Sequence, residues 1–496
     1  MEIRYTSTRG GEHDIPASKA VLNGLAVDGG LYVPQNMPKM EVAFEDLAKM
    51  SYQELAFEVM SRFLTDYTEE ELKYCINSAY DEKFDIPEIA ALKKEDGAYF
   101  LELFHGKTIA FKDMALSILP YLMTTAAKKN EVKEKIVILT ATSGDTGKAA
   151  MAGFADVPGT EIIVFYPKDG VSPVQERQMV TQKGENTHVV AIRGNFDDAQ
   201  TGVKNIFGDK NVAAKLLEKG FRFSSANSIN IGRLIPQVAY YVYAYAQLVK
   251  NGEIKAGDPI NVVVPTGNFG NILAAYYAKQ MGFPFAKLIC ASNENKVLTD
   301  FFRSGTYDKN RDFFTTSSPS MDILVSSNLE RLIYKVAGED AAKTKELMMA
   351  LSKGGSYTIT EEMNAQLADF YGNYADEAAV SYAIASMYDN TGYVMDPHTA
   401  VADAVYNMYQ EETGDKTLTV IASTASPYKF ARSVLHAIDG ERFDELTDME
   451  QFDALEEVSE VKTPNAIEEI KNAPVRHNTV VNIDEMESAI LKILSI

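Results

Sequence analysis

The chain has 496 residues, more than one compact hydrophobic core usually includes, so we expect two or three domains. Its formal net charge of -22 argues against a nucleic-acid or anionic-membrane partner, and it means that a small anionic substrate would need local positive groups. Cys75 and Cys290 are too few for a disulfide framework or a cysteine-rich metal site, and the charged, polar start lacks a signal-peptide core, so the composition predicts a cytoplasmic protein.

The first part of the chain is predicted to be helical and to form a domain of its own. Residues 51–64, "SYQELAFEVMSRFL", place apolar side chains at helical spacing. Thr68 followed by Glu71 has the pattern of a capping box, which predicts that another helix begins there. Because the pattern changes at about residue 96, we expect an N-terminal domain over residues 1–95.

From about residue 96 to 440, short β-branched runs alternate with amphipathic helical segments. Examples are "KIVILTAT" before "TGKAAMAGFA" and "PINVVVPT" before "NILAAYYAKQMG". This alternation predicts an α/β fold with two open, mostly parallel sheets flanked by helices. We also expect a mostly helical insertion at about 300–385 and a C-terminal extension over 441–496. The most apolar stretch, "LIPQVAYYVYAYAQLV", contains proline and glutamine and is too short to span a bilayer, so it predicts a buried helix and no membrane partner.

Lys112 stands at the edge of an apolar run in "HGKTIAFKDMALSILP". It could be a lysine at a helix start, with its stem packed and its ammonium group in water. Alternatively, it could be kept partly dry so that it loses its proton and attacks a carbonyl group. The segment alone leaves both interpretations open.

In parallel sheets, chemistry gathers where strands end and loops lead into helices. One such loop, in "VVVPTGNFGNILAAYYAK", contains Gly267, Asn268, Phe269, Gly270 and Asn271. Glycines let the backbone direct several N–H groups at one point, and a helix N-terminus adds partial positive charge, so the loop could hold a phosphate. It matches neither the P-loop nor the dinucleotide fingerprint, and an ordinary strand-to-helix turn is equally compatible with it.

Two more loops are rich in small polar residues. In "TATSGDTG", Thr142, Ser143, Asp145 and Thr146 lie between a strand and a helix. Hydroxyls and N–H groups at a helix start suit a carboxylate, although Ser143 or Asp145 could simply cap the helix, which is the commoner use of such residues.

In "SSANSINIGRLIPQ", Ser228, Asn230 and Arg233 open the apolar helix, and the guanidinium group could bind a phosphate or carboxylate through two parallel hydrogen bonds. Taken alone, a surface arginine beside a polar cap is the better explanation of Arg233. A reactive lysine combined with a phosphate loop, however, suits a cofactor that carries an aldehyde and a phosphate, which is pyridoxal 5'-phosphate.

Further stretches make the whole chain recognisable. In chain order they are "YTSTRG", "DGGLYVP", "HGKTIAFKD", "SGDTG", "SANSINIGRL", "PTGNFGN", "SPSMDI" with "SSNLERL", "DPHTA" and "STASPYKF". Together they resemble the long-form threonine synthases, which are fold type II (tryptophan synthase β-like) pyridoxal-phosphate enzymes, over essentially the full chain. Lys107 stands where relatives commonly have proline. Asp145 stands where much of the wider fold type has asparagine, but aspartate is usual in this family.

The resemblance implies a role for each candidate residue. Lys112 would bind the cofactor as a Schiff base and act as the acid and base, residues 267–271 would hold its phosphate, and the Thr424 hydroxyl would lie beside its ring nitrogen. Thr142, Ser143, Asp145 and Thr146 would face the substrate carboxylate and the phenolic oxygen of the cofactor. Ser228, Asn230 and Arg233 would hold the departing phosphate.

The implied reaction converts O-phospho-L-homoserine and water to L-threonine and phosphate, in a monomer or homodimer without a metal. Two alternatives stay open. One is a serine/threonine dehydratase or another β-replacement enzyme of the same fold type, which would not require Arg233. The other is a non-catalytic homologue that binds a phosphorylated metabolite, which would not require a reactive Lys112.

Overall fold

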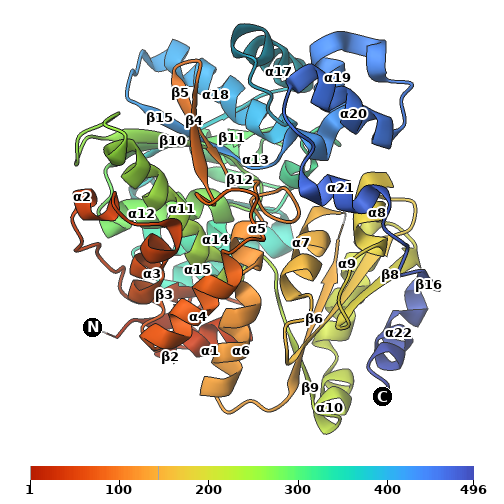
Figure 1. The fold of residues 1–496 in the computed structure, drawn as a ribbon. Coiled ribbons are helices and arrows are strands. Elements are labelled where there is room, and N and C mark those ends of the chain that lie inside the picture. The colour runs from red at the N-terminus through yellow and green to blue at the C-terminus, as the bar shows by residue number, and fades with distance from the viewer. Residues whose placement is uncertain (1, 143, 172) are drawn as a thin grey trace.

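The computed structural model describes residues 2–142, 144–171 and 173–496. It contains a large α/β lobe, a smaller α/β lobe and an N-terminal region that packs against both (Figure 1). Two open sheets lie at the centre of the lobes, as the alternation of strands and helices predicted.

The large lobe is built on a six-stranded sheet in the order β14-β11-β10-β15-β5-β4. All neighbours are parallel except β4, which forms an antiparallel hairpin with β5. Successive residues of β10 enter different cores, with Val262 and Val264 in one and Val263 in the other, so both faces are buried. The strands are β4 (Ala91–Glu95), β5 (Ala98–Glu102), β10 (Ile260–Pro265), β11 (Phe285–Ser292), β14 (Phe370–Tyr374) and β15 (Thr419–Ser423).

Helices cover the two faces of this sheet. The core on one side includes residues of α11 (Ile231–Lys250) and α12 (Gly270–Met281), and the core on the other includes residues of α17 (Glu377–Thr391), α18 (Pro397–Thr413) and α19 (Ala431–Asp439). Helix α11 is the buried apolar helix that the sequence predicted. Within the described part of the chain, no helix is long and apolar enough to cross a membrane.

The smaller lobe has a parallel five-stranded sheet in the order β16-β8-β7-β6-β9. Its outer core includes residues of α9, α10 and α22, while its other face joins the main core of the protein. The strands are β6 (Lys135–Ala141), β7 (Thr160–Pro167), β8 (Thr187–Arg193), β9 (Phe221–Ser224) and β16 (Thr479–Asn482), and the helices are α7 (Asp145–Phe154), α8 (Pro173–Val180), α9 (Phe196–Gly208), α10 (Lys210–Glu218) and α22 (Met486–Ile493).

The N-terminal region combines a small antiparallel sheet with helices that pack on the lobes. Helix α3 packs on α11, and α1 packs on α6. The capping box predicted at Thr68 and Glu71 is present at the start of α4. The elements are β1 (Arg4–Ser7), β2 (Ile15–Pro16), α1 (Ala17–Asn23), β3 (Tyr32–Pro34), α2 (Phe44–Leu47), α3 (Tyr52–Phe63), α4 (Glu69–Ala79), α5 (Asp113–Leu116) and α6 (Leu119–Lys129).

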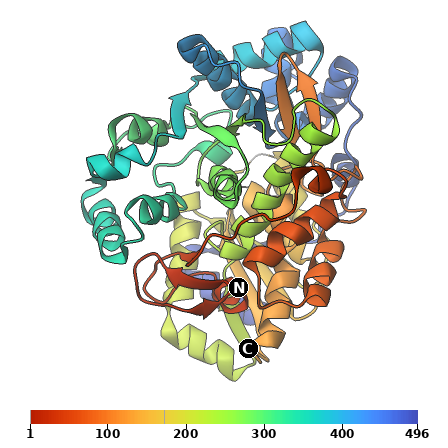
Figure 2. The same ribbon diagram turned by 90° about the vertical axis from the view of Figure 1, so that its left-hand side faces the viewer.

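The segment predicted as a helical insertion projects to one side of the large lobe (Figure 2). It is mostly helical, with one two-stranded ribbon, β12–β13. It also contains β14, which is an edge strand of the six-stranded sheet and which the sequence analysis did not separate from the insertion. The elements are α13 (Val297–Ser304), β12 (Thr306–Asp308), η1 (Pro319–Met321), α14 (Leu329–Val336), α15 (Ala341–Gly354), β13 (Ser356–Thr358) and α16 (Glu361–Ala365).

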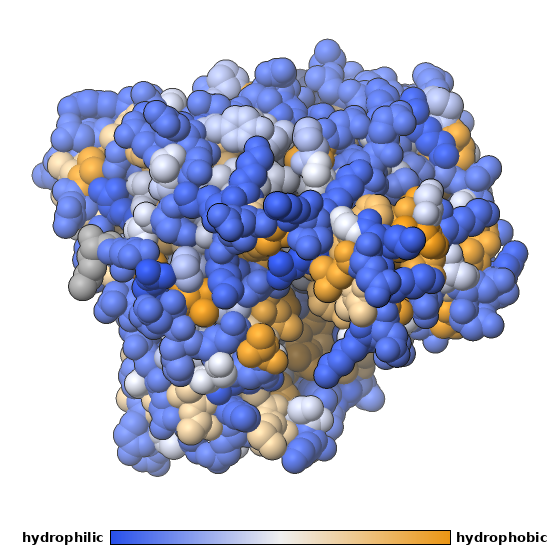
Figure 3. Space-filling model, turned by 90° about the horizontal axis from the view of Figure 1, so that it is seen from below, coloured by the Kyte–Doolittle hydropathy of each residue, from blue (hydrophilic) through white to orange (hydrophobic). Residues whose placement is uncertain are grey.

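The C-terminal extension connects the two lobes. Residues of α20 and α21 belong to a core of the large lobe, whereas β16 pairs with β8 and α22 packs on the smaller lobe. Figure 1 shows this dark-blue segment running along the right-hand side of the molecule. Seen from below, the surface is largely hydrophilic, with hydrophobic side chains around a central recess (Figure 3). The remaining elements are η2 (Pro427–Phe430), η3 (Gly440–Phe443), α20 (Asp448–Ser459), α21 (Asn465–Lys471) and η4 (Ile483–Glu485).

Candidate active site

Lys112 directly precedes α5, in a segment that lies against the end of β15. The Phe111 amide donates to the Thr424 carbonyl at 2.8 Å, and the Ser426 amide donates to the Ile109 carbonyl at 3.0 Å. Thr424 is buried. The parallel sheet therefore brings together residues 112 and 424, which were both predicted to bind the cofactor, although they are far apart in the sequence.

The Lys112 side chain is kept largely dry, since the residue is only 9% exposed. Its Nζ donates to Ser320 Oγ at 3.1 Å and lies 3.8 Å from Asp145 Oδ2. Burial lowers the pKa of Lys112 to about 8; Lys429 and Arg233 act in the same direction, and Asp145 opposes them. An amine with this pKa is partly neutral near pH 8, so the structure favours the reactive interpretation of Lys112 over the solvated one.

Asp145, at the start of α7, is held by cations. Its carboxylate lies 3.3 Å from Lys429 Nζ and accepts a hydrogen bond from Gln175 Nε2 at 3.2 Å. Burial alone raises the pKa of Asp145, but Lys429 and Lys112 lower it more, so the pKa lies well below its usual value. The carboxylate is therefore ionised at any working pH. Lys429 is itself fixed by a 2.8 Å hydrogen bond to the Thr108 carbonyl.

The loop between β10 and α12 has the geometry expected of an anion site. Phe269, just before the helix, has φ of 65°, and a side chain at Gly267 would begin 2.8 Å from the Ser320 carbonyl oxygen. Asn268 is held through its carbonyl by Asn328. Asn271 is buried, and its Nδ2 has no hydrogen-bond partner among the described residues. The N–H groups at the start of α12, together with this amide, fit a phosphate.

The loop before α7 is closed by Thr142. Its buried hydroxyl accepts hydrogen bonds from the amides of Gly144 and Gly147, both at 3.0 Å. Thr146 is half-buried in the first turn of the helix. Ser143 lies outside the described residues. The hydroxyl of Thr142 is thus already used to shape the loop, and the helix N–H groups are the remaining donors for a carboxylate.

The start of α11 carries one structural residue, Asn230, and one buried cation, Arg233. Asn230 caps the helix: its Oδ1 accepts from the Gly232 amide at 2.8 Å, and its Nδ2 donates to the Val21 and Ser225 carbonyls at 3.0 Å. All its polar atoms are therefore used, while Ser228 nearby is half-buried.

Arg233 is 3% exposed and donates to the Ala226 carbonyl at 3.1 Å. Its Nε has no hydrogen-bond partner, and it forms no ion pair, within the described part of the chain. Burial lowers the pKa of Arg233 to about 10, so the group stays charged at neutral pH. A buried guanidinium without an acidic partner is suited to binding an anion.

The N-terminal region braces this loop. Arg331, in α14, donates to the Tyr32 carbonyl at 2.9 Å and to the Ile229 carbonyl at 2.6 Å. The neighbouring Glu330 accepts from Thr8 Oγ1 at 2.7 Å and pairs with Arg9 at 2.7 Å. The two N-terminal motifs therefore fix the position of the helix that carries Arg233.

Sequence reasoning missed several residues of the site. Ser320 contacts Lys112 directly, Lys429, Gln175 and His398 lie two contacts away, and Asp396 follows His398. Most of them occur in stretches that carried the family resemblance, "SPSMDI", "STASPYKF" and "DPHTA". That resemblance was the available signal, but spacing along the chain does not reveal which of these stretches meet.

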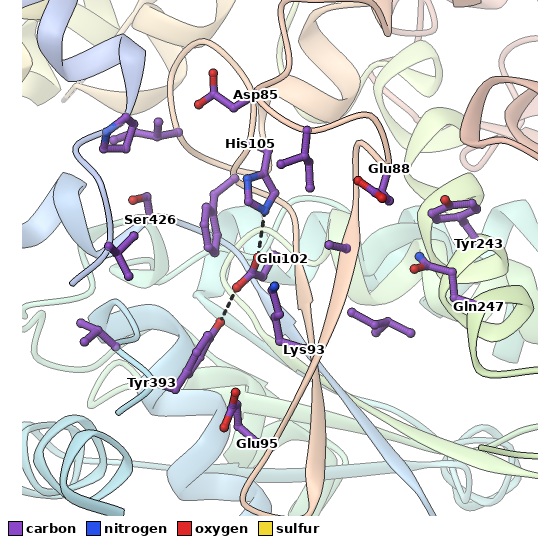
Figure 4. Close-up of a pocket in the computed structure, with 18 of the residues that line it drawn as sticks. Asp85, Glu88, Lys93, Glu95, Glu102, His105, Tyr243, Gln247, Tyr393 and Ser426 are labelled. Carbon is purple, nitrogen blue, oxygen red and sulfur yellow. Dashed lines mark hydrogen bonds and ion pairs between the residues drawn. The ribbon is translucent and has the colours of Figure 1, made fainter. Parts of the chain in front are cut away.

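A cavity of about 950 Å³ opens elsewhere, at the free edge of β4 (Figure 4). At its centre, Glu102 accepts a 3.1 Å hydrogen bond from the Tyr393 hydroxyl and lies 2.9 Å from His105 Nε2. None of the predicted site residues lines it; it adjoins the segment of Lys112 through His105 and Ile109. The candidate site around Lys112 is therefore identified by its charged and polar side chains, and not by the size of a cavity.

Three family models match in chain order. They are Threonine synthase N terminus over residues 4–80, Pyridoxal-phosphate dependent enzyme over 84–424, and Threonine synthase, C-terminal over 399–484. The threonine synthase of Schizosaccharomyces pombe is 37% identical over 465 residues, which cover 87% of this chain and 89% of that protein. The chain belongs to the threonine synthase family.

Two further likenesses extend this result. The chain superposes on the pyridoxal-phosphate-bound threonine synthase from Brucella melitensis with a TM-score of 0.88 and 33% identity, covering 100% of both chains. Threonine synthase-like 1 of Homo sapiens is 40% identical over 449 residues, which cover 88% of this chain but 60% of that protein, so the chain spans about three fifths of the length of such relatives. The predicted family, fold type II class and pyridoxal phosphate cofactor are confirmed.

Proposed function

We propose that the chain is a threonine synthase, which converts O-phospho-L-homoserine and water to L-threonine and phosphate. The observation that carries this proposal is a buried lysine amine with a pKa of about 8 that shares its site with a buried arginine for which the described residues provide no acidic partner. The amine suits amino-acid chemistry with pyridoxal phosphate, and the arginine suits a phosphorylated side chain. We also propose a cytoplasmic location and a monomer or homodimer.

Three parts of the chain would hold the cofactor. Lys112 would join it covalently, the loop from Gly267 to Asn271 would hold its phosphate with N–H groups, and the Thr424 hydroxyl would lie beside its ring nitrogen. Bound pyridoxal phosphate withdraws electrons from the α-carbon of an amino acid, so that nearby C–H bonds become acidic. A hydroxyl beside the ring nitrogen protonates it less firmly than a carboxylate would, which moderates this effect.

Lys112 would move the protons of the substrate. Its amine must be neutral to remove a proton and charged to return one, and a pKa of about 8 allows both near neutral pH. We assign Asp145 to this amine, because an ionised carboxylate repels a substrate carboxylate but attracts an ammonium group. The negative charge of Asp145 raises the pKa of Lys112 and so offsets part of the lowering that burial and Lys429 cause.

Anion binding is divided between two helix starts. Arg233 and Ser228, at the start of α11, would hold the substrate phosphate and stabilise it as it leaves, where negative charge collects. The N–H groups at the start of α7, with Thr142, Ser143 and Thr146, would hold the substrate carboxylate. Asn230 would act indirectly by fixing the loop. These local groups resolve the difficulty of an anionic substrate approaching a protein with a net charge of -22.

A test follows directly from these assignments. The purified full-length chain should be yellow, borohydride should remove the colour, and the reduced adduct should map to Lys112. Incubated with O-phospho-L-homoserine, the protein should release phosphate and L-threonine in equal amounts. An adduct at another lysine would overturn the site assignment. Deamination of threonine or serine without any phosphate release would overturn the function in favour of a dehydratase, and binding without turnover would favour a non-catalytic homologue.

A further inference from the structure

Ser320 bridges the two charged groups at the centre of the site. Lys112 Nζ donates to Ser320 Oγ at 3.1 Å, and Ser320 Oγ donates to Asp145 Oδ2 at 3.2 Å. The direct distance from the lysine nitrogen to the carboxylate oxygen is 3.8 Å, which is too long for a hydrogen bond. The hydroxyl is therefore the hydrogen-bonded link between the amine and its counterion.

The backbone of Ser320 is fixed on both sides. Its amide donates to His398 Nε2 at 3.2 Å, and its carbonyl oxygen lies against Gly267, where a Cβ would come within 2.8 Å. Because Nε2 accepts this hydrogen bond, the ring proton of His398 is on Nδ1, which donates to the buried Asp396 at 2.7 Å. The pair His398–Asp396 thus sets the direction of the serine.

The loop that carries Ser320 is also anchored from within. Asp322 accepts hydrogen bonds from Asn293 at 2.8 Å, from Asn295 at 2.9 Å and from Thr316 at 2.8 Å. A loop held by so many buried side-chain contacts keeps one conformation. The insertion of the large lobe therefore holds the Ser320 hydroxyl in a fixed position beside Lys112.

We propose that Ser320 is a positioning residue for Lys112: its hydroxyl holds the free amine during turnover and transmits to it the orientation set by Asp145 and by the His398–Asp396 pair. This proposal rests on the proposed role of Lys112 as the proton-transferring group. A catalytic amine on a flexible side chain gains rate when it is held in one place, because the reacting atoms then meet in the correct geometry.

The effect of removing the hydroxyl follows from the charges around Lys112. Asp145 from α7 and Asp113 from α5 favour the ammonium form, while Lys429 from η2 and Arg233 from α11 oppose it. His398 from α18 is reached through the Ser320 amide.

Because Lys429 and Gln175 anchor Asp145 at 3.3 and 3.2 Å, the carboxylate stays in place when the hydroxyl is removed. The ammonium form of Lys112 then loses an acceptor without gaining another, and the pKa of Lys112 falls.

The experiment measures the Lys112 amine itself. Full-length chain freed of cofactor is labelled with acetic anhydride over a range of pH, and the extent at Lys112 is read by peptide mass spectrometry. Ser320→Ala should move the labelling midpoint down by about one pH unit, the shift expected for one lost charge-assisted hydrogen bond. Ser320→Thr, which keeps the hydroxyl, should restore the parent midpoint, and Ser320→Cys, a weak acceptor, should behave like alanine.

Ser317→Ala is the matched control, because it removes a hydroxyl from the same loop that makes no hydrogen bond within the described part of the protein. In the loaded enzyme, Ser320→Ala should lower kcat about tenfold with little change in KM, and the acidic limb of the kcat profile should shift down with the labelling midpoint. An unchanged or raised midpoint in both Ser320→Ala and Ser320→Cys would overturn the proposal. Labelling needs no substrate, so this outcome is distinct from a failure of threonine synthase activity.

Discussion

Two buried aspartates in this protein have opposite charge states. Asp145 lies between Lys429 and Lys112, and its pKa is held well below its usual value. Asp403, 5% exposed in α18, has no ion-pair partner among the described residues. Burial, with a smaller contribution from the nearby Asp96, raises the pKa of Asp403 to about 7.

The two aspartates show that the neighbouring charged groups, and not residue type or burial alone, decide whether a buried carboxyl group is ionised in this protein. At the Lys112 site, buried ions are arranged in pairs, so a carboxylate and an amine can both remain chemically useful. In α18, by contrast, the carboxyl group of Asp403 is partly protonated at neutral pH and is packed as a buried side chain. Predictions can be made for each member of this comparison.

The largest effect is expected for Lys112→Ala. It removes the group that would hold the cofactor and move the protons, so phosphate release from O-phospho-L-homoserine should fall about 10⁴-fold or more. Lys93→Ala, at an exposed position on β4, is the control and should stay within about twofold of the parent. If Lys112→Ala kept the parent's activity, the active site could not be centred on Lys112.

Asp145→Asn tests the charged member of the pair directly. The substitution removes the negative charge that raises the pKa of Lys112, so that pKa should fall below about 8 and the acidic limb of the rate profile should move to lower pH. We expect kcat to fall about 100-fold. Asp403→Asn should leave the profile unchanged. If Asp145→Asn and Asp403→Asn shift the profile equally, the Asp145 charge does not specifically control the pKa of Lys112.

Arg233→Lys tests whether the unpaired guanidinium binds the substrate phosphate. An ammonium group keeps the charge but loses the paired hydrogen bonds, so KM should rise about tenfold while kcat changes less. Inhibition by inorganic phosphate should weaken in parallel. Arg432→Ala, on the surface of the large lobe, serves as the control. A variant with the parent's KM, kcat and inhibition by phosphate would place Arg233 outside the phosphate site.

The smallest effect concerns stability at Asp403. The folded pKa of about 7 lies above the unfolded value near 4, so the protonated carboxyl favours folding at low pH and this contribution is lost as the pH rises through 7. Asp403→Asn should therefore raise the melting temperature by a few degrees at pH 8, with the gain diminishing toward pH 5. Thermal unfolding at the two pH values measures it. An equal change at both would show that Asp403 does not titrate in this range.

Much of the fold could be predicted because it depends on local patterns. The alternation of β-branched runs and amphipathic segments revealed the parallel sheets, and the apolar run at 231–250 revealed helix α11. Strand β14, "FYGNY", escaped because it is short and polar and follows a helical segment. Pairing with β11 makes it a strand, and pairing is not visible in one segment of sequence.

The site was predictable in its parts but not in its connections. Lys112 and the loop at 267–271 have local signals, a lysine in an apolar run and glycines before a helix. Ser320 and Lys429 have none, because an ordinary serine and lysine acquire their roles only where the insertion and the end of β15 meet α7. The resemblance implies that Asn230 binds the substrate phosphate, yet its Oδ1 caps α11 and its Nδ2 donates to the Val21 and Ser225 carbonyls.

The order of strands also has a consequence for the nascent chain. Strands β6 to β9 of the smaller lobe come from one continuous segment, residues 135–224, whereas the six-stranded sheet needs β5 early and β15, at 419–423, late. As the polypeptide leaves the ribosome, strands β6 to β9 can therefore pair while the larger sheet still lacks its central strand, and β16 and α22 complete the smaller lobe last. Translation must pass residue 423 before Thr424 reaches Lys112, and only then do the two halves of the cofactor site exist together.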